Sequence, residues 1–107
     1  MSGAEVTSSR VGDRLVIRVA GEVDFANVDE LHAALADVPA DVAIVALDLT
    51  GLDFMDSMAL AAILEAEMRA EERGAELRLV CGAAAHRVID AAGLDGRLAV
   101  EEPDGAA

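Results

Sequence analysis

The sequence predicts one α/β domain: a mixed β-sheet that begins with an antiparallel hairpin, continues through parallel crossovers and is flanked by helices. Three observations predict this fold class. The turn pair Gly12-Asp13 separates two strand-like runs, which is typical of a hairpin. Residues 42–49 are almost all apolar, as in a central parallel strand that is covered on both faces. After the hairpin, strand-like and helix-like runs alternate along the chain.

The first half of the chain is expected to supply the hairpin and one crossover helix. Strands are predicted over residues 6–11 and 14–20, and residues 21–24 are expected to form a tight acidic exit from the second strand. A helix is predicted to begin at Asn27, and Pro39 marks the end of that unit. The apolar stripe of this helix consists of Val28, Leu31, Ala34 and Leu35.

The second half is expected to add two further crossovers. A short acidic loop leads from the central strand into a helix that is predicted to begin near Ser57 and to stop at Gly74. A strand is predicted over residues 77–80, a helix over residues 83–92 and a short edge strand over residues 98–100. The apolar stripe of the helix beginning near Ser57 is expected to comprise Leu60, Ile63, Leu64 and Met68.

Length and composition limit the possible functions. The 107 residues suffice for one domain, expected over residues 5–101, with a frayed tail over residues 102–107. A net charge of −13 argues against nucleic acid and anionic membranes as partners and favours a protein with a basic face. Neither a leader-like segment nor an apolar run of about 18 residues occurs. We therefore expect a cytoplasmic protein without membrane insertion.

Asp56-Ser57 is the first candidate for functional chemistry. Ser57 lies at or next to a predicted helix N-terminus, where unpaired N–H groups and the helix dipole favour an anion. One interpretation is structural: Asp53 or Asp56 caps the helix and Ser57 occupies its first turn. The other is regulated phosphorylation of Ser57, which adds roughly −1.5 to −2 charges beside two acidic residues. The residue types alone leave both interpretations open.

Asp24 is the second candidate. It follows the second predicted strand, and Asp56 follows the next parallel strand. The carboxyl ends of parallel strands meet at one edge of a sheet, so both carboxylates are expected to flank Ser57 on one acidic face. Alternatively, Asp24 is simply a turn residue.

Enzymatic and metal sites find little support in the residue pattern. A serine hydrolase would need His32 or His86 as its base, and the residues around Ser57 lack a Gly-x-Ser-x-Gly elbow. Two histidines and one cysteine, Cys81, show no metal-ligand spacing. Cys81 is expected to be a small buried hydrophobic residue. We therefore predict no catalytic residue, no metal and no cofactor.

Three segments together resemble the STAS domain of bacterial anti-sigma factor antagonists. They are Gly21-Glu22-Val23-Asp24, the run Leu-Asp-Leu-Thr-Gly-Leu-Asp-Phe-Met-Asp-Ser over residues 47–57, and Gly93-Leu94. The resemblance covers about residues 5–101. In that family the unphosphorylated antagonist binds an anti-sigma factor that is also a serine kinase, and so releases a sigma factor for transcription. Phosphorylation of a motif serine dissociates the complex, and a phosphatase restores it.

Carried over by position, the resemblance implies Ser57 as the phosphoacceptor, Asp56 as the neighbouring motif acid and Asp24 as part of the docking face. The chain departs from the family pattern directly after the serine, where Met58-Ala59 replaces a serine or threonine followed by glycine. We therefore expect Met58 and Ala59 to influence how the partner approaches. The alternative function is a STAS module that binds without being phosphorylated, in a signalling assembly or a transporter complex.

Overall fold

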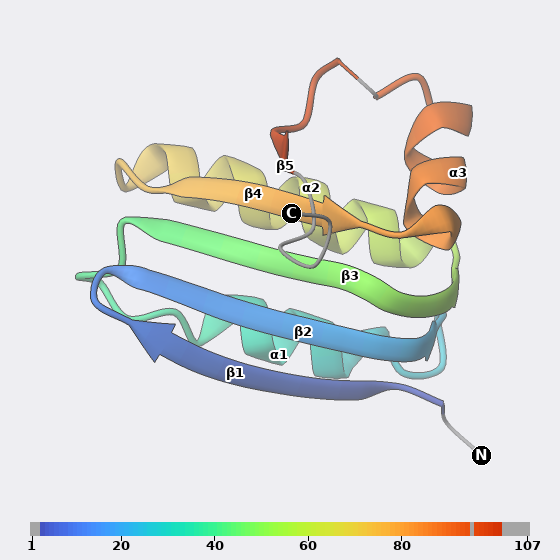
Figure 1. Cartoon of the computed structure of the whole chain (residues 1–107), viewed down its shortest axis with the longest axis horizontal. Helices are drawn as coiled ribbons and strands as arrows, with labels where there is room; N and C mark the ends of the chain where they lie inside the picture. Colours follow the sequence, from blue (N-terminus) through green and yellow to red (C-terminus); the bar gives the residue numbers. More distant parts are fainter. Residues whose placement is uncertain (1–2, 95, 102–107) are drawn as a thin grey trace.

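The computed structural model describes residues 3–94 and 96–101, and over these residues it forms a five-stranded sheet with three helices (Figure 1). The elements are β1 (Glu5–Val11), β2 (Arg14–Val23), α1 (Val28–Ala36), β3 (Ile44–Met55), α2 (Ser57–Glu72), β4 (Glu76–Cys81), α3 (Ala83–Ala91) and β5 (Val100–Glu101). The strands lie in the order β1-β2-β3-β4-β5; β1 is antiparallel to β2, and all later neighbours are parallel. The predicted fold class is confirmed. The tail predicted over residues 102–107 lies outside the described residues.

The sheet is covered by helices on one face rather than two. Each parallel strand is added on the same side of the strand before it, and right-handed crossovers that step in one direction place their helices on the same face. Figure 1 shows α1 and α2 together behind the sheet, while α3 packs near the carboxyl end of β3. The predicted strand over residues 42–49 is therefore central and parallel. Helices α1 and α2 cover one of its faces, and on the other face Ala46 is buried and Asp48 is partly buried.

The core lies between the sheet and the first two helices. Alternate positions of the central strands point toward α1 and α2, as the two-residue period of a strand requires. These buried strand residues are Leu15, Ile17, Val19, Val45, Leu47, Leu49, Leu77 and Leu79. The predicted stripe of α1 is confirmed, since its three larger members are buried and Ala34 packs against them. No aromatic ring contributes to this core, because the two phenylalanines of the chain are both exposed.

The apolar face of α2 differs from its prediction. Met68 is exposed, whereas Leu60 and Ile63 are buried as expected. Buried alanines complete this face, and their small side chains allow α2 to lie close to the layer beneath it; they are Ala59, Ala62, Ala66 and Ala70. The last strand also differs, because Val100–Glu101 rather than residues 98–100 pairs with β4, and Leu98 belongs to the core.

Strands β2 and β3 both continue beyond their predicted ends. The expected acidic exit at residues 21–24 is strand as far as Val23, and the expected loop after Leu49 is strand as far as Met55. The two extensions pair with each other through register shifts, beside Gly21 with its positive φ of 90°. The two extensions therefore hydrogen-bond to each other. The residues that were expected to form turns instead lie at register shifts within the paired strands.

Asp48 stabilises β3 where this extension begins, on the face away from the helices. Its Oδ1 accepts hydrogen bonds from the Thr50 backbone N–H at 3.0 Å and from the Thr50 hydroxyl at 2.6 Å. Arg18 Nε on β2 lies 3.3 Å from Asp48 Oδ2. Burial alone would raise the pKa of Asp48, but the hydrogen bonds from Thr50 and Arg18 outweigh it, so the pKa is lowered. The Asp-Leu-Thr-Gly run thus has a structural role.

Replacing Asp48 should therefore lower stability in a pH-dependent way. A carboxylate whose folded pKa is lowered contributes stability above its unfolded pKa of about 3.9, and that contribution is lost as the pH falls through the folded value. We expect Asp48→Asn to lower the free energy of unfolding by about 1 kcal/mol at pH 7, with the deficit shrinking below pH ~4. Urea denaturation at pH 7, 5 and 3 measures this, and a deficit that stays constant across that range contradicts it.

Candidate functional site

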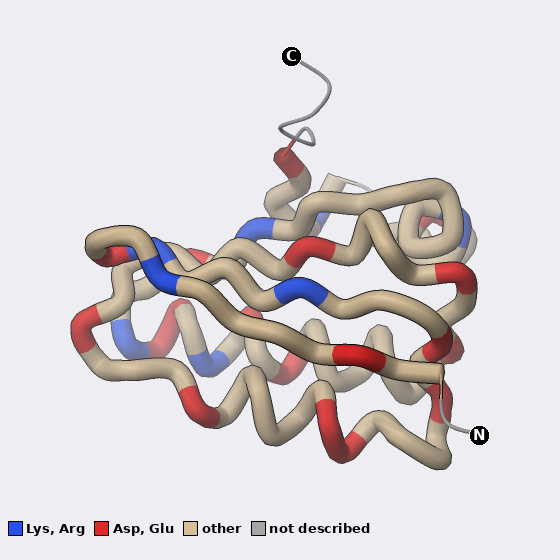
Figure 2. Tube along the Cα trace, turned by 60° about the horizontal axis from the view of Figure 1, so that its bottom comes forward, with Lys and Arg blue, Asp and Glu red and all other residues tan. Residues whose placement is uncertain are grey.

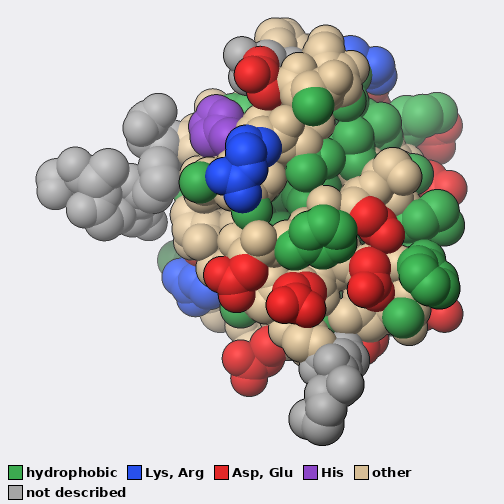
Figure 3. All heavy atoms as spheres, turned by 90° about the vertical axis from the view of Figure 1, so that its right-hand side faces the viewer, with side chains coloured by type: hydrophobic (Ala, Val, Ile, Leu, Met, Phe, Trp, Pro, Cys, Tyr) green, Lys and Arg blue, Asp and Glu red, His purple; other side chains and the backbone are tan. Residues whose placement is uncertain are grey.

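The candidate site lies where β2 and β3 end and α2 begins. The backbone N–H of Asp56 donates to the carbonyl oxygen of Val23 at 3.2 Å, so the ends of the two strands are joined directly. Figure 3 views the molecule from this end, where hydrophobic and acidic side chains are intermixed on the surface. Acidic positions occur on every layer of the fold, including the strand ends at the right of Figure 2.

The Asp56 carboxylate connects two segments of this end. Its Oδ1 accepts hydrogen bonds from the backbone N–H groups of Met58 and Ala59, at 3.0 and 3.1 Å, which caps α2. Its Oδ2 accepts a hydrogen bond from the backbone N–H of Phe25 at 3.1 Å. One side chain therefore caps the helix and holds the loop between β2 and α1 against it. The capping interpretation of this acid is correct, and Asp56 rather than Asp53 is the cap.

The loop between β2 and α1 is shaped by its own polar side chains. Asp24 Oδ1 accepts a hydrogen bond from the Ala26 backbone N–H at 2.9 Å. The buried Asn27 side chain accepts from the Asp24 N–H and donates to the Glu22 carbonyl, both at 2.9 Å. Asn27 occupies the N-cap position of α1, but no cap hydrogen bond is made by its side chain; instead it fixes the loop. As a result Asp24 and Asp56 lie on adjacent segments, as the strand order predicts.

Ser57 is the first residue of α2 and is exposed. Met58 beside it is 49% exposed, so its side chain is accessible to a partner. Ala59 is different: it is 1% exposed, and its methyl group belongs to the core. The expectation that Ala59 meets a partner directly is therefore corrected, because a Cβ that points inward cannot obstruct an approach from outside.

Two exposed aromatic residues were not among the residues that the sequence singled out for binding. Phe25 is 78% exposed and Phe54 is 50% exposed. Phe25 donates its backbone N–H to Asp56, and Phe54 lies two residues before that acid. A signal was present, because these are the only aromatic residues of the chain and both fall in polar segments next to strand ends. We call Phe25, Phe54 and Met58 the apolar patch.

The remaining reactive side chains make no hydrogen bond with Ser57 among the described residues, although one histidine is visible on the face shown in Figure 3. His32 Nδ1 is 4.0 Å from Glu65 Oε1 at the surface of α1 and α2, and His86 is exposed on α3. Burial raises the pKa of the Cys81 thiol to about 11, which agrees with the expected hydrophobic role. Among the described residues, no three His, Cys, Asp or Glu side chains gather as metal ligands. No helix within the described residues is long and apolar enough to cross a membrane.

The fold and the strand-end motif together define a STAS domain. A family model of that description matches residues 5–102, and the chain belongs to this family. The resemblance found in the sequence is confirmed. Over 82 residues the chain is 34% identical to a Mycobacterium tuberculosis protein named "Putative anti-anti-sigma factor Rv2638". The match covers 74% of this chain and 55% of that protein, so the chain spans about half the length of this relative.

Solved structures share the architecture. An anti-sigma factor antagonist from Mycobacterium paratuberculosis superposes with a TM-score of 0.80 at 23% identity, covering 96% of this chain and 89% of that one. The unphosphorylated form of the anti-sigma factor antagonist SpoIIAA gives a TM-score of 0.78 at 19% identity, covering 92% and 88%. At these identities the likeness concerns the fold.

Removing the Asp56 carboxylate should weaken the junction of the two segments. Asp56→Ala leaves the N–H groups of Met58, Ala59 and Phe25 without this acceptor, so we expect a loss of about 1–2 kcal/mol in the free energy of unfolding. Asp53→Ala is the matched control: it removes an exposed acid nearby and should change stability by less than about 0.5 kcal/mol. Equal effects of the two variants in urea denaturation would refute the role of Asp56.

Proposed function

We propose that the chain is an anti-sigma factor antagonist, a regulatory binding protein rather than an enzyme, whose functional unit is the STAS domain over residues 5–101. Its partner would be an anti-sigma factor that is also a serine kinase, and its binding would release a sigma factor. The observation that carries this proposal is the placement of Ser57: an exposed residue that begins α2, directly after the capping Asp56 and directly before the exposed Met58. The curated relative and the family membership support it.

The docking face that we propose combines apolar area with negative charge. Phe25, Phe54 and Met58 offer side chains to bury, and exposed aromatic residues are common anchors of protein interfaces. Asp24 and Asp56 add negative charge beside them, in a chain of net charge −13, which favours a basic partner surface. Asp56 already occupies two N–H groups of the helix start, so it acts chiefly by holding the segments in place.

Phosphorylation of Ser57 would switch this face off. The Asp56 carboxylate already accepts from the N–H groups of Met58 and Ala59, so a phosphate on Ser57 gains little from the helix terminus. It would instead stand in solvent with roughly −1.5 to −2 charges beside other acids. We infer that it leaves the fold intact and weakens docking through repulsion and desolvation. A phosphatase would then restore the binding form.

A second candidate function is a STAS module that binds without phosphorylation, in a signalling assembly or a transporter complex. The observation that favours it is the exposed Met58 directly after Ser57, which extends the apolar patch up to the hydroxyl. Such a patch can bind a partner without any change in charge. A serine hydrolase lacks comparable support, because neither histidine makes a hydrogen bond with Ser57 in the described part of the chain.

Charge at position 57 should control partner binding. We expect Ser57→Ala to bind the purified anti-sigma factor of the same organism with unchanged affinity, whereas Ser57→Asp binds at least about tenfold more weakly. Incubation with that partner and ATP should add one phosphate to the native chain and none to Ser57→Ala, measured by intact mass. Equal affinities of the two variants would rule out the switch, and binding without any gain in mass would favour the second candidate function.

The apolar patch should contribute to affinity independently of the charge. We expect Phe25→Ala to weaken binding of the same partner by roughly fivefold or more, because a largely exposed ring that is buried on docking is removed. Met68→Ala is the control, since this exposed side chain lies eleven residues along α2 from Ser57, or about 17 Å. Calorimetric titration measures both, and losses of equal size would show that the patch is not the docking face.

A further inference from the structure

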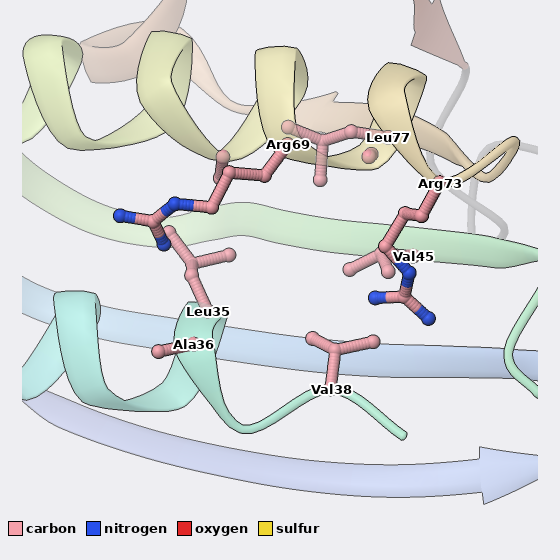
Figure 4. Close-up of a pocket in the computed structure, with 9 residues that line it drawn as sticks. Leu35, Ala36, Val38, Val45, Arg69, Arg73 and Leu77 are labelled. Carbon is pink, nitrogen blue, oxygen red and sulfur yellow. The ribbon is translucent and has the colours of Figure 1, made fainter. Parts of the chain in front are cut away.

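A cavity of about 220 Å³ opens at the other end of the helical layer from Ser57. It lies between the ends of α1 and α2, above the first parts of β3 and β4 (Figure 4). Its walls are aliphatic: Leu35, Val38, Val45 and Leu77 line it together with alanines of both helices. The polar side chains of the lining are those of Arg69 on α2 and of Arg73, the residue that follows α2, and both extend along the mouth.

The two arginines differ in how their charges are balanced. Arg69 pairs with Glu65 one helical turn earlier. Arg73 donates a hydrogen bond from Nη2 to the Pro39 carbonyl oxygen at 2.6 Å, and within residues 3–94 and 96–101 no carboxylate lies within 4.0 Å of it. A guanidinium has five N–H donors, so most of those of Arg73 are available. In the described part of the chain the arginines that do have a carboxylate partner are Arg10, Arg14, Arg18, Arg69, Arg78 and Arg97.

The chain has 21 acidic residues and eight arginines, yet among the described residues Arg73 and Arg87 have no carboxylate partner. Of these two, Arg73 alone lines the cavity. Helix-dipole compensation gives Arg73 one role, since it is the C-cap residue of α2. That role does not require a position over an apolar cavity. A guanidinium at the mouth of an aliphatic pocket is complementary to a ligand with an anionic head and a hydrocarbon body.

We propose that this pocket binds a small aliphatic carboxylate, whose hydrocarbon body fills the cavity and whose head accepts hydrogen bonds from Arg73. An apolar cavity of about 150 Å³ holds benzene, so 220 Å³ accommodates a body of roughly six to eight carbon atoms. The lining has no aromatic ring on which a planar base would stack. One guanidinium matches a single negative charge, whereas a phosphate head carries up to two. This site is separate from Ser57 and independent of the proposed function.

Octanoate is the probe, and its binding is followed by amide shifts in nitrogen–proton NMR spectra. We expect saturable shifts at Leu35, Val45 and Leu77, and none at Phe25 or Ser57. Octanol, which lacks the charge, should bind about tenfold more weakly, and acetate, which lacks the hydrocarbon body, should not saturate. Non-saturating shifts with octanoate, or equal affinity for octanol, would overturn the proposal without any variant of the protein.

Variants at position 73 test the anion-binding group. Arg73→Gln should weaken octanoate about tenfold and leave octanol unchanged, while Arg73→Lys keeps the charge and should lose less. Arg87→Gln is the matched control, since Arg87 also lacks a carboxylate partner among the described residues but lies on α3, away from the lining. Equal octanoate affinity of Arg73→Gln and the native chain would overturn the role of Arg73, provided that well-dispersed amide signals show both proteins to be folded.

Discussion

The hydrogen bonds accepted by the Asp56 carboxylate hold together the end of the molecule where β2 and β3 end and α2 begins. Its two oxygens accept three backbone hydrogen bonds: one from Phe25, 31 residues earlier in the chain, and two from Met58 and Ala59 in the first turn of α2. An uncapped helix start would leave these donors to water, and the loop after β2 would lose its anchor. The same acid thus determines where Ser57 is presented and which side chains stand around it. Asp56 therefore stabilises the fold at this end and also fixes the position of the proposed phosphorylation site.

The direction in which the sheet grows explains the rest of the arrangement. Because β2, β3 and β4 follow one another in space as they do in sequence, α1 and α2 share one face. Their N-terminal ends adjoin the carboxyl ends of β2 and β3, where the proposed docking face lies. Their C-terminal ends leave the aliphatic cavity at the opposite end of the layer. The two proposed sites are thus consequences of one topology, at opposite ends of the same pair of helices.

Local chemistry was enough to predict most of the fold. The Gly12-Asp13 turn, the apolar period of α1 and the acid before Ser57 act over a few residues, and each led to the correct element. The extension of β3 to Met55 could not be predicted in this way, because it depends on a partner strand more than 25 residues earlier along the chain. Gly51 and Asp53 are of residue types that are depleted in strands, and the pairing of Gly51 with Ala20 and of Leu52 with Gly21 makes this segment part of β3.

The sequence predicted the acidic residues of the candidate site, but it did not predict the exposed aromatic residues beside them. Strand order alone placed Asp24 and Asp56 on adjacent segments. The exposure of Phe25 depends on how the loop after β2 is folded, which the spacing of residues does not reveal. The inward direction of Ala59 does follow from spacing, because Ala59 lies four residues before the buried Ile63 on one helix face.

Both aromatic rings lie at the surface, and this has a spectroscopic consequence. The chain contains neither tryptophan nor tyrosine, so it contributes almost no emission of its own when near-ultraviolet light excites a complex. Indole fluorescence from such a complex therefore comes from the tryptophan residues of the partner protein alone. The phenyl resonances, in turn, belong entirely to the surface around Asp56, where they serve as built-in reporters of contact without any attached label.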